Sequence, residues 1–343
     1  MVISAAVSLH KGLNINQVVE NLSQKWTQSL LKKYPSDDKR IDKGIQFLKN
    51  LFKEFINSDY SDPKFSTQIT TKNGLQYEQA LGELLFYDIL KKNHFNFEKN
   101  SGKGPDFKVN KKGMTIWCEV ITPQSDNAGI IEGINTNKDY LNPKVEENIK
   151  YNNEILLRIT SALHTKEKKF IADIEKGLVQ DTDCCIIVIN DALLCPSDIG
   201  YFGMSHSVDS DSASTHPPLI AKATLLETSI KNKNGQEISL SGFLNSSLSH
   251  ISAIIQVTLR DDYAYMEGMK QFDSKSLLGM VGLIKIPDIV LNNNSRNKIS
   301  KELFDMKYWS VVEDKILSSQ KPIEATKQDI EDYKEHQKKL FGI

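Results

Sequence analysis

The stretch GPDFKVNKKGMTIWCEVITP, residues 104–123, decides the fold that we expect of this chain. Residues 107–109 and 114–121 have the apolar and β-branched content of two strands. Between them, Asn110-Lys111-Lys112-Gly113 has the composition of a tight hairpin turn. The segment therefore predicts an antiparallel β-hairpin whose tip is formed by Lys111 and Lys112.

The register of this hairpin decides where its two acidic residues lie. With Lys111 and Lys112 at the tip, Asp106 faces Trp117, and Glu119 lies two residues further along the same sheet face. The acidic pair are then diagonal neighbours, with Cα atoms about 7–8 Å apart. Carboxylates at that spacing suit a shared divalent cation, which prefers oxygen ligands. A one-residue change in loop length would put them on opposite faces and remove the site.

A third carboxylate, Glu83, lies in a stretch that is apolar almost all round. Residues 80–90 (ALGELLFYDIL) predict a helix buried within the domain. On a helical wheel Glu83 falls between Tyr87 and Leu90, away from water. A buried carboxylate needs a partner or a metal ion, because its charge is costly to desolvate. An arginine or a backbone amide would satisfy Glu83 as well as a metal would, so both interpretations stay open.

The rest of the chain predicts an α/β order of elements around a mixed sheet. The expected divisions are a helical N-terminal region over residues 1–60, a core over 74–290 with a polar loop at 200–217, and a helical C-terminal extension over 291–343. Hydrophobic periodicity gives the elements within them. The expected helices cover residues 14–34, 37–57, 75–93 and 143–178. Whether the last is broken near His164 stays open. The expected strands also include 94–98, 184–190, 251–259 and 281–286.

Composition bounds the functional classes. The chain has 343 residues, 39% of them hydrophobic and 25% charged, which is ordinary for a globular protein that can bury a large core. Its 43 Lys and Arg residues against 44 Asp and Glu residues give a net charge of −1. No global positive field therefore attracts nucleic acid, although a local basic patch is compatible with a neutral total.

The cysteines and the apolar runs indicate where the protein works. None of the four cysteines forms a CxxC pair, so neither a zinc knuckle nor a disulfide framework is indicated. No apolar run approaches the roughly 20 residues of a membrane span, so no membrane partner is expected. We expect a cytoplasmic protein with reduced thiols; secretion as a bacterial effector is the alternative.

These features together resemble the PD-(D/E)XK nuclease superfamily, also called restriction-endonuclease-like. The resemblance covers residues 74–190 and is carried by Glu83 on a helix, Pro105-Asp106 opening the hairpin, and Glu119 in the next strand. It implies an α/β fold with a mixed central sheet flanked by helices. It also implies Mg²⁺- or Mn²⁺-dependent hydrolysis of phosphodiester bonds, with Asp106, Glu119 and Glu83 as metal ligands.

The motif departs from the family at its lysine. The resemblance places a lysine two residues after the strand acid, where this chain has Ile121. Lys166 is the best substitute, because it lies on the apolar face of the predicted helix that follows, where an ammonium needs anionic company. Arg158 and Lys169 flank that face and could contact phosphate. If the helix breaks near His164, Lys166 would instead join an exposed basic run without a role.

Two functions of different classes follow. The first is a metal-dependent nuclease acting on DNA or RNA, with Asp106, Glu119, Glu83 and Lys166 as the catalytic set. The second is an inactive module of the same fold that binds a protein or nucleic acid, which Ile121 and the neutral net charge favour; a bacterial effector is a variant of it. The helical N-terminal region and the segment beyond residue 260 have no assigned role and could serve as a homodimer surface or as a specificity arm.

Overall fold

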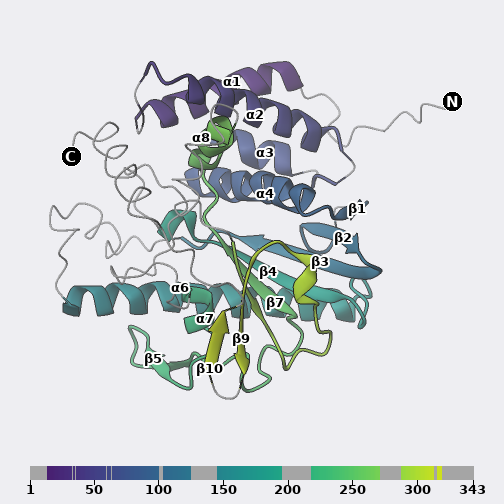
Figure 1. Cartoon of the computed structure of the whole chain (residues 1–343), viewed down its shortest axis with the longest axis vertical. Helices are drawn as coiled ribbons and strands as arrows, with labels where there is room; N and C mark the ends of the chain where they lie inside the picture. Colours follow the sequence, from purple (N-terminus) through teal and green to yellow (C-terminus); the bar gives the residue numbers. More distant parts are fainter. Residues whose placement is uncertain are drawn as a thin grey trace.

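The structure is a computed structural model, and it shows an α/β protein with helices on both faces of a mixed sheet (Figure 1). The expected mixed central sheet flanked by helices is confirmed. The structure describes residues 14–318 apart from 33, 35, 59, 63, 100–102, 125–144, 195–217, 271–286 and 313–314.

The sheet has eight strands in the order β1-β2-β3-β4-β7-β8-β9-β10. The first three form an antiparallel meander, β3, β4 and β7 are mutually parallel neighbours, and β8 is antiparallel to β7. At the far edge β9 is parallel to β8 and β10 antiparallel to β9. The strands are β1 (Asn96–Glu98), β2 (Phe107–Lys111), β3 (Met114–Ile121), β4 (Cys184–Asn190), β7 (Ala253–Val257), β8 (Asp288–Leu291), β9 (Lys307–Val312) and β10 (Lys315–Ser318).

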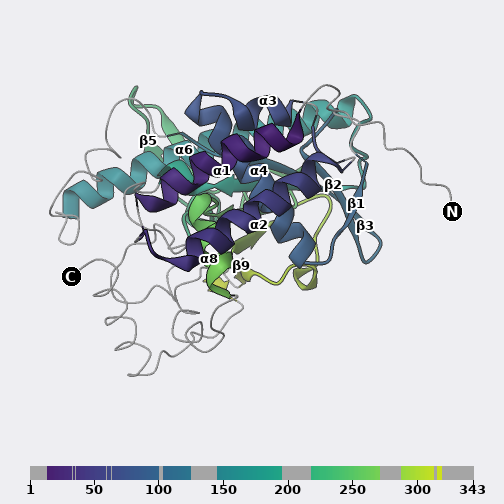
Figure 2. The same ribbon diagram turned by 90° about the horizontal axis from the view of Figure 1, so that it is seen from above.

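Each face of the sheet has its own helical layer and its own hydrophobic cluster. One face is covered by α1 (Ile15–Leu31), α2 (Lys39–Ile56), α3 (Phe65–Thr70), α4 (Gly74–Lys92) and α8 (Asp261–Lys270), with α1 and α2 outermost (Figure 2). The other carries α6 (Val145–Glu175), α7 (Leu219–Lys222) and the small hairpin of β5 (Ser229–Lys231) and β6 (Glu237–Ser239). Two short 3-10 helices, η1 (Asp191–Leu194) and η2 (Lys301–Leu303), complete the described elements.

Side-chain caps define where the first helices begin. Asn14, Asp38 and Asn73 each accept a hydrogen bond from a backbone N–H in the first turn of α1, α2 and α4. Such caps satisfy amides that have no partner within the helix. The predicted limits of these three helices agree with the structure to within three residues. Helix α4 is buried continuously from Ala80 to Leu90, as expected.

The predicted tip of the hairpin is wrong by one residue. Lys111 pairs with Met114, and the turn residues are Lys112 and Gly113, both with positive φ (51° and 78°). This is the geometry of a two-residue hairpin turn, and glycine adopts it without strain. The loop keeps its length, so the faces are unchanged. Extending the register by one pair places Asp106 directly opposite Glu119 rather than diagonal to it.

One alternative is excluded and one further expectation is corrected. Helix α6 runs without a break through His164, because the apolar face continues on both sides of that residue. The helical C-terminal extension is wrong for residues 307–318, which form β9 and β10 at the sheet edge. The expected strand at 281–286, the polar loop at 200–217 and the last 25 residues of the chain lie outside the described residues. Among the described residues, no helix is long and apolar enough to span a membrane.

Gly44 controls the packing of α2 against α8, and its replacement should destabilise the protein. A Cβ added there would lie 2.6 Å from the carbonyl oxygen of Ala264. The clash would be with the backbone of α8, so it could be relieved only by moving one helix away from the other. Gly44→Ala should therefore lower the free energy of unfolding by about 1–3 kcal/mol. The control is Gly74→Ala, another helical glycine, where a Cβ meets nothing within 4 Å. Equal melting temperatures of the two variants by circular dichroism would contradict this packing.

Candidate functional site

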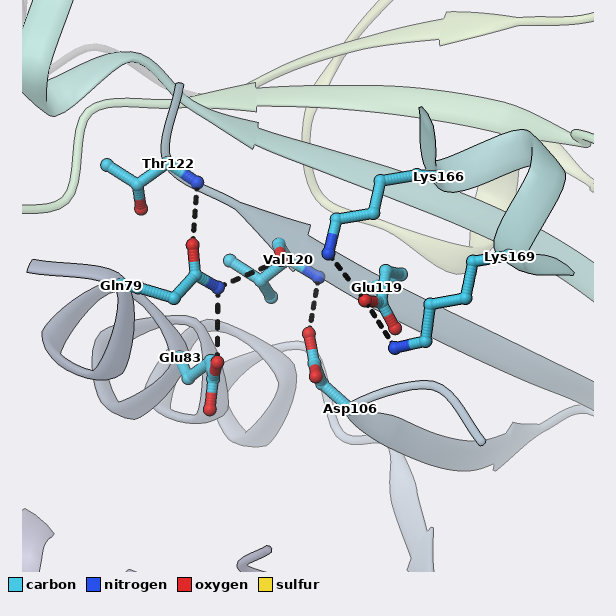
Figure 3. Close-up of polar contacts among 8 residues, drawn as sticks. All are labelled: Gln79, Glu83, Asp106, Glu119, Val120, Thr122, Lys166 and Lys169. Atoms are coloured by element: carbon cyan, nitrogen blue, oxygen red, sulfur yellow. Dashed lines mark hydrogen bonds and ion pairs between the residues drawn. The ribbon is translucent and has the colours of Figure 1, made fainter. Parts of the chain in front are cut away.

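The candidate site lies where three layers of the fold meet at the end of β3. Glu83 comes from α4, Asp106 immediately precedes β2, and Glu119 belongs to β3 (Figure 3). Lys166 and Lys169 reach the same place from α6 on the other face of the sheet. The structure thus brings together all four residues selected from the sequence, Glu83, Asp106, Glu119 and Lys166. Lys169, expected beside them as a phosphate contact, binds Glu119 instead.

Glu119 is the most buried of the three acids and is held by two lysines. Its side chain shares a sheet face with Trp117, which packs in the hydrophobic cluster beneath α6. The Nζ atoms of Lys166 and Lys169 each lie 2.6 Å from Glu119 Oε1. The residue is only 1% exposed, and Oε2 has no hydrogen-bond partner among the described residues. A buried carboxylate is tolerated here because cations neutralise it.

Asp106 continues the hydrogen bonding of the β3 edge beyond the end of β2. The last pair of the hairpin is Phe107 with Cys118, and past it Asp106 Oδ2 accepts a hydrogen bond of 2.7 Å from the Val120 amide. Burial raises the pKa of Asp106 well above its usual range, and the charges of Glu119 and Glu83 raise it further. The protonation of Asp106 is therefore coupled to the charges of the other two carboxylates.

Glu83 obtains its partner from its own helix. Gln79, one turn earlier on α4, donates from Nε2 to Glu83 Oε1 at 3.1 Å. The satisfying group is therefore a side-chain amide, neither the arginine nor the backbone amide considered from the sequence. Burial raises the pKa of Glu83 to about 7, with the charge of Glu119 adding to the effect and the Gln79 hydrogen bond opposing it. Near neutral pH, Glu83 is poised between its two protonation states.

Gln79 is a site residue that the sequence analysis missed. Its amide also donates to Val120 O at 2.9 Å and accepts from Thr122 N at 2.8 Å. One side chain thus takes the place of a neighbouring strand along the β3 edge and joins it to Glu83 (Figure 3). The available signal was its position four residues before Glu83, on the same helix face.

Two further residues near Glu119 on β3, Ile121 and Trp117, belong to the hydrophobic packing of this face. Ile121 is half-buried and packs against the cluster beneath α6, two residues beyond Glu119 on the same face. Trp117 is buried, and its Nε1 donates to Asp183 Oδ2 at 2.8 Å. Ile121 supplies no cation at the position where the resemblance places a lysine. The lysines on α6 reach the same face of the sheet.

The donor set has the chemistry of a site for Mg²⁺ or Mn²⁺. These ions prefer carboxylate oxygens, and within the described part of the chain the buried Glu119 Oε2 has no hydrogen-bond partner. In the described part of the chain, no three acidic, His or Cys side chains already converge as a metal cluster. The residues present fit such an ion, with Asp106, Glu119 and Glu83 as the groups that would hold it.

Comparison of the chain with protein-family models, with curated proteins and with solved structures gave no match. The geometry of this site is therefore the basis for inferring its function.

The raised pKa of Glu83 predicts a stability that depends on pH. The folded protein holds this proton up to about pH 7, whereas an unfolded glutamate releases it near pH 4.5. The stabilisation is complete below pH 4.5 and is lost as the pH rises through 7. Glu83→Gln should therefore stabilise the protein relative to wild type at pH 8 by on the order of 3 kcal/mol, and much less at pH 5. Thermal melting at both pH values tests this, with Glu175→Gln on the exposed end of α6 as control; a pH-independent difference would contradict it.

Removal of the Gln79 amide should open the edge of β3. Gln79→Ala leaves Val120 O and Thr122 N without their partner, at a cost of about 1–3 kcal/mol. We expect faster amide hydrogen exchange at Thr122 and a lower melting temperature. Gln76→Ala, on the exposed side of the same helix, should leave both unchanged. Unaltered hydrogen exchange at Thr122 in Gln79→Ala would show that the hydrogen bonds of Gln79 do not hold this edge.

Proposed function

We propose that this protein is a metal-dependent nuclease of the PD-(D/E)XK type, which hydrolyses phosphodiester bonds in DNA or RNA. The single observation that carries the proposal is the contact of Lys166 Nζ with Glu119 Oε1 at 2.6 Å, beside Asp106 and Glu83. Three carboxylates and a lysine are the components that the resemblance requires. The lysine comes from α6 instead of from the strand.

The order of the elements supports the same proposal. A helix bearing Glu83 is followed by the meander β1-β2-β3, then by α6, and then by β4 parallel to β3. Asp106 and Glu119 are brought together by the hairpin alone. Lys166 reaches them because α6 crosses back over the sheet between two parallel strands. A mixed sheet covered by helices on both faces agrees with the fold that the resemblance implies.

Each residue has a chemical role in this proposal. Asp106, Glu119 and Glu83 would hold Mg²⁺ or Mn²⁺, which would supply an activated water at neutral pH and positive charge against the transition state. Lys166, whose side chain is 18% exposed, is held rigidly by Glu119 and can orient the attacking water and stabilise charge that develops on the phosphate. Glu83 must lose its proton before it can bind metal, so metal affinity rises with pH.

A specific observation also favours the alternative of a non-catalytic binding module. Two ammonium groups already neutralise Glu119 Oε1, as in a buried ion cluster whose role is structural. Such a cluster would fasten α6 to the sheet without any chemistry. The net charge of −1 agrees with this alternative. Metal binding without cleavage of any nucleic acid would favour it.

Cleavage assays with matched variants test the proposed nuclease. Wild-type protein should cut at least one of supercoiled DNA, single-stranded DNA and RNA in Mg²⁺ or Mn²⁺, and should stop when the metal is chelated. Lys166→Met should lower the rate by about 100-fold or more, because a preorganised cation is lost. Asp106→Asn should stay folded but lose Mn²⁺ affinity.

Lys168→Met is the control, because Lys168 is exposed on the same helix. It should cut as well as wild type. Cleavage that persists in Asp106→Asn would show that the activity does not come from this site.

A further inference from the structure

Lys169 shares its acceptor with a second lysine. Its Nζ lies 2.6 Å from Glu119 Oε1, and Lys166 Nζ lies at the same distance from the same oxygen. The two ammonium nitrogens are therefore separated by no more than twice that distance, and like charges so close repel each other. This arrangement is favourable only while the buried carboxylate of Glu119 attracts both cations.

The two lysines differ in how firmly they are enclosed. The Lys166 side chain is 18% exposed, whereas that of Lys169 is 41% exposed. Burial lowers the pKa of Lys169, but the charges of Glu119, Asp106 and Asp173 raise it, so it lies above its ordinary value. Lys169 is therefore the cation that can leave Glu119 with less loss of packing.

Asp173 offers a second acceptor for Lys169. It lies one turn further along α6, four residues from Lys169, a spacing at which oppositely charged side chains meet on a helix. Asp173 is only 5% exposed, and its Oδ2 has no hydrogen-bond partner among the described residues. A buried carboxylate oxygen in that state is costly. An ammonium that moved onto it would remove the cost.

We infer that Lys169 is an exchangeable cation, which neutralises Glu119 in the metal-free protein and moves to Asp173 when a divalent ion binds Glu119. Lys166 stays on Glu119 in both states. The inference rests on the metal site of the proposed function, but it does not require that the protein cuts nucleic acid.

The charges explain the direction of the exchange. A divalent ion next to Glu119 adds two positive charges where two ammonium groups already lie, so one cation must leave. When Lys169 moves, the repulsion falls and Asp173 gains its missing partner. Metal affinity should therefore depend on Asp173, although that residue does not hold the metal. This dependence on a residue outside the ligand set is what a merely structural ion cluster would lack.

A double-mutant cycle on the full chain, read by Mn²⁺ binding in calorimetry, tests the exchange. Lys169→Met removes the competing cation and should tighten Mn²⁺ binding about tenfold. Asp173→Asn removes the second acceptor and should weaken it by a similar factor. In the double variant Asp173→Asn should have no further effect, because no lysine remains to be moved. Lys168→Met is the control and should bind as wild type does.

Three results would overturn the exchange: weaker Mn²⁺ binding in Lys169→Met, an unchanged affinity in Asp173→Asn, or the same effect of Asp173→Asn with and without Lys169. A wild type that binds no Mn²⁺ would also overturn it, whatever the cleavage assay shows. Mn²⁺ affinities that follow the cycle in a protein that cuts nothing would support the exchange and reject the nuclease. Circular dichroism of each variant shows that it is folded.

Discussion

The site depends on one electrostatic constraint, which is the burial of the Glu119 carboxylate inside the sheet. An anion that is 1% exposed is stable only if cations or hydrogen-bond donors replace the water it has lost. Here both cations come from α6, so the charge of one strand residue fixes the helix above it. The two ion pairs with Glu119 therefore neutralise the site and also attach α6 to this face of the sheet.

The edge of β3 imposes the second constraint. Where β2 ends, the backbone of β3 still needs partners, and side chains supply them: Asp106 accepts from Val120, while Gln79 bonds both Val120 and Thr122. Because these side chains belong to the two flanking segments, closing the edge also brings Asp106 and Glu83 near Glu119. Satisfaction of backbone hydrogen bonds thus assembles the three carboxylates.

The approach of α4 to the sheet makes this assembly possible. Gly82, beside Glu83, lies so close to the sheet that an added Cβ would be 2.8 Å from Asn190 Nδ2. Asn190 is itself fixed by Thr122 and by the backbone of Leu259. A larger residue than glycine would move the helix outward and with it Gln79 and Glu83. The same close contact brings Glu83 into a buried environment, which is why its pKa rises to about 7.

The sequence by itself determined the hairpin, the buried helix of Glu83 and the shared face of Asp106 and Glu119. These are local properties, since strand residues alternate with a period of two and a loop of unchanged length preserves that alternation. It also selected Lys166, because a lysine on an apolar helix face requires an anion. Only the tertiary structure decided the strands β9 and β10, the hydrogen bonds of Gln79 to β3 and the second lysine on Glu119. It also decided that Asp173 Oδ2 has no hydrogen-bond partner among the described residues. Each depends on which element packs beside which, and contacts between residues far apart in the chain leave no periodic signal in either segment.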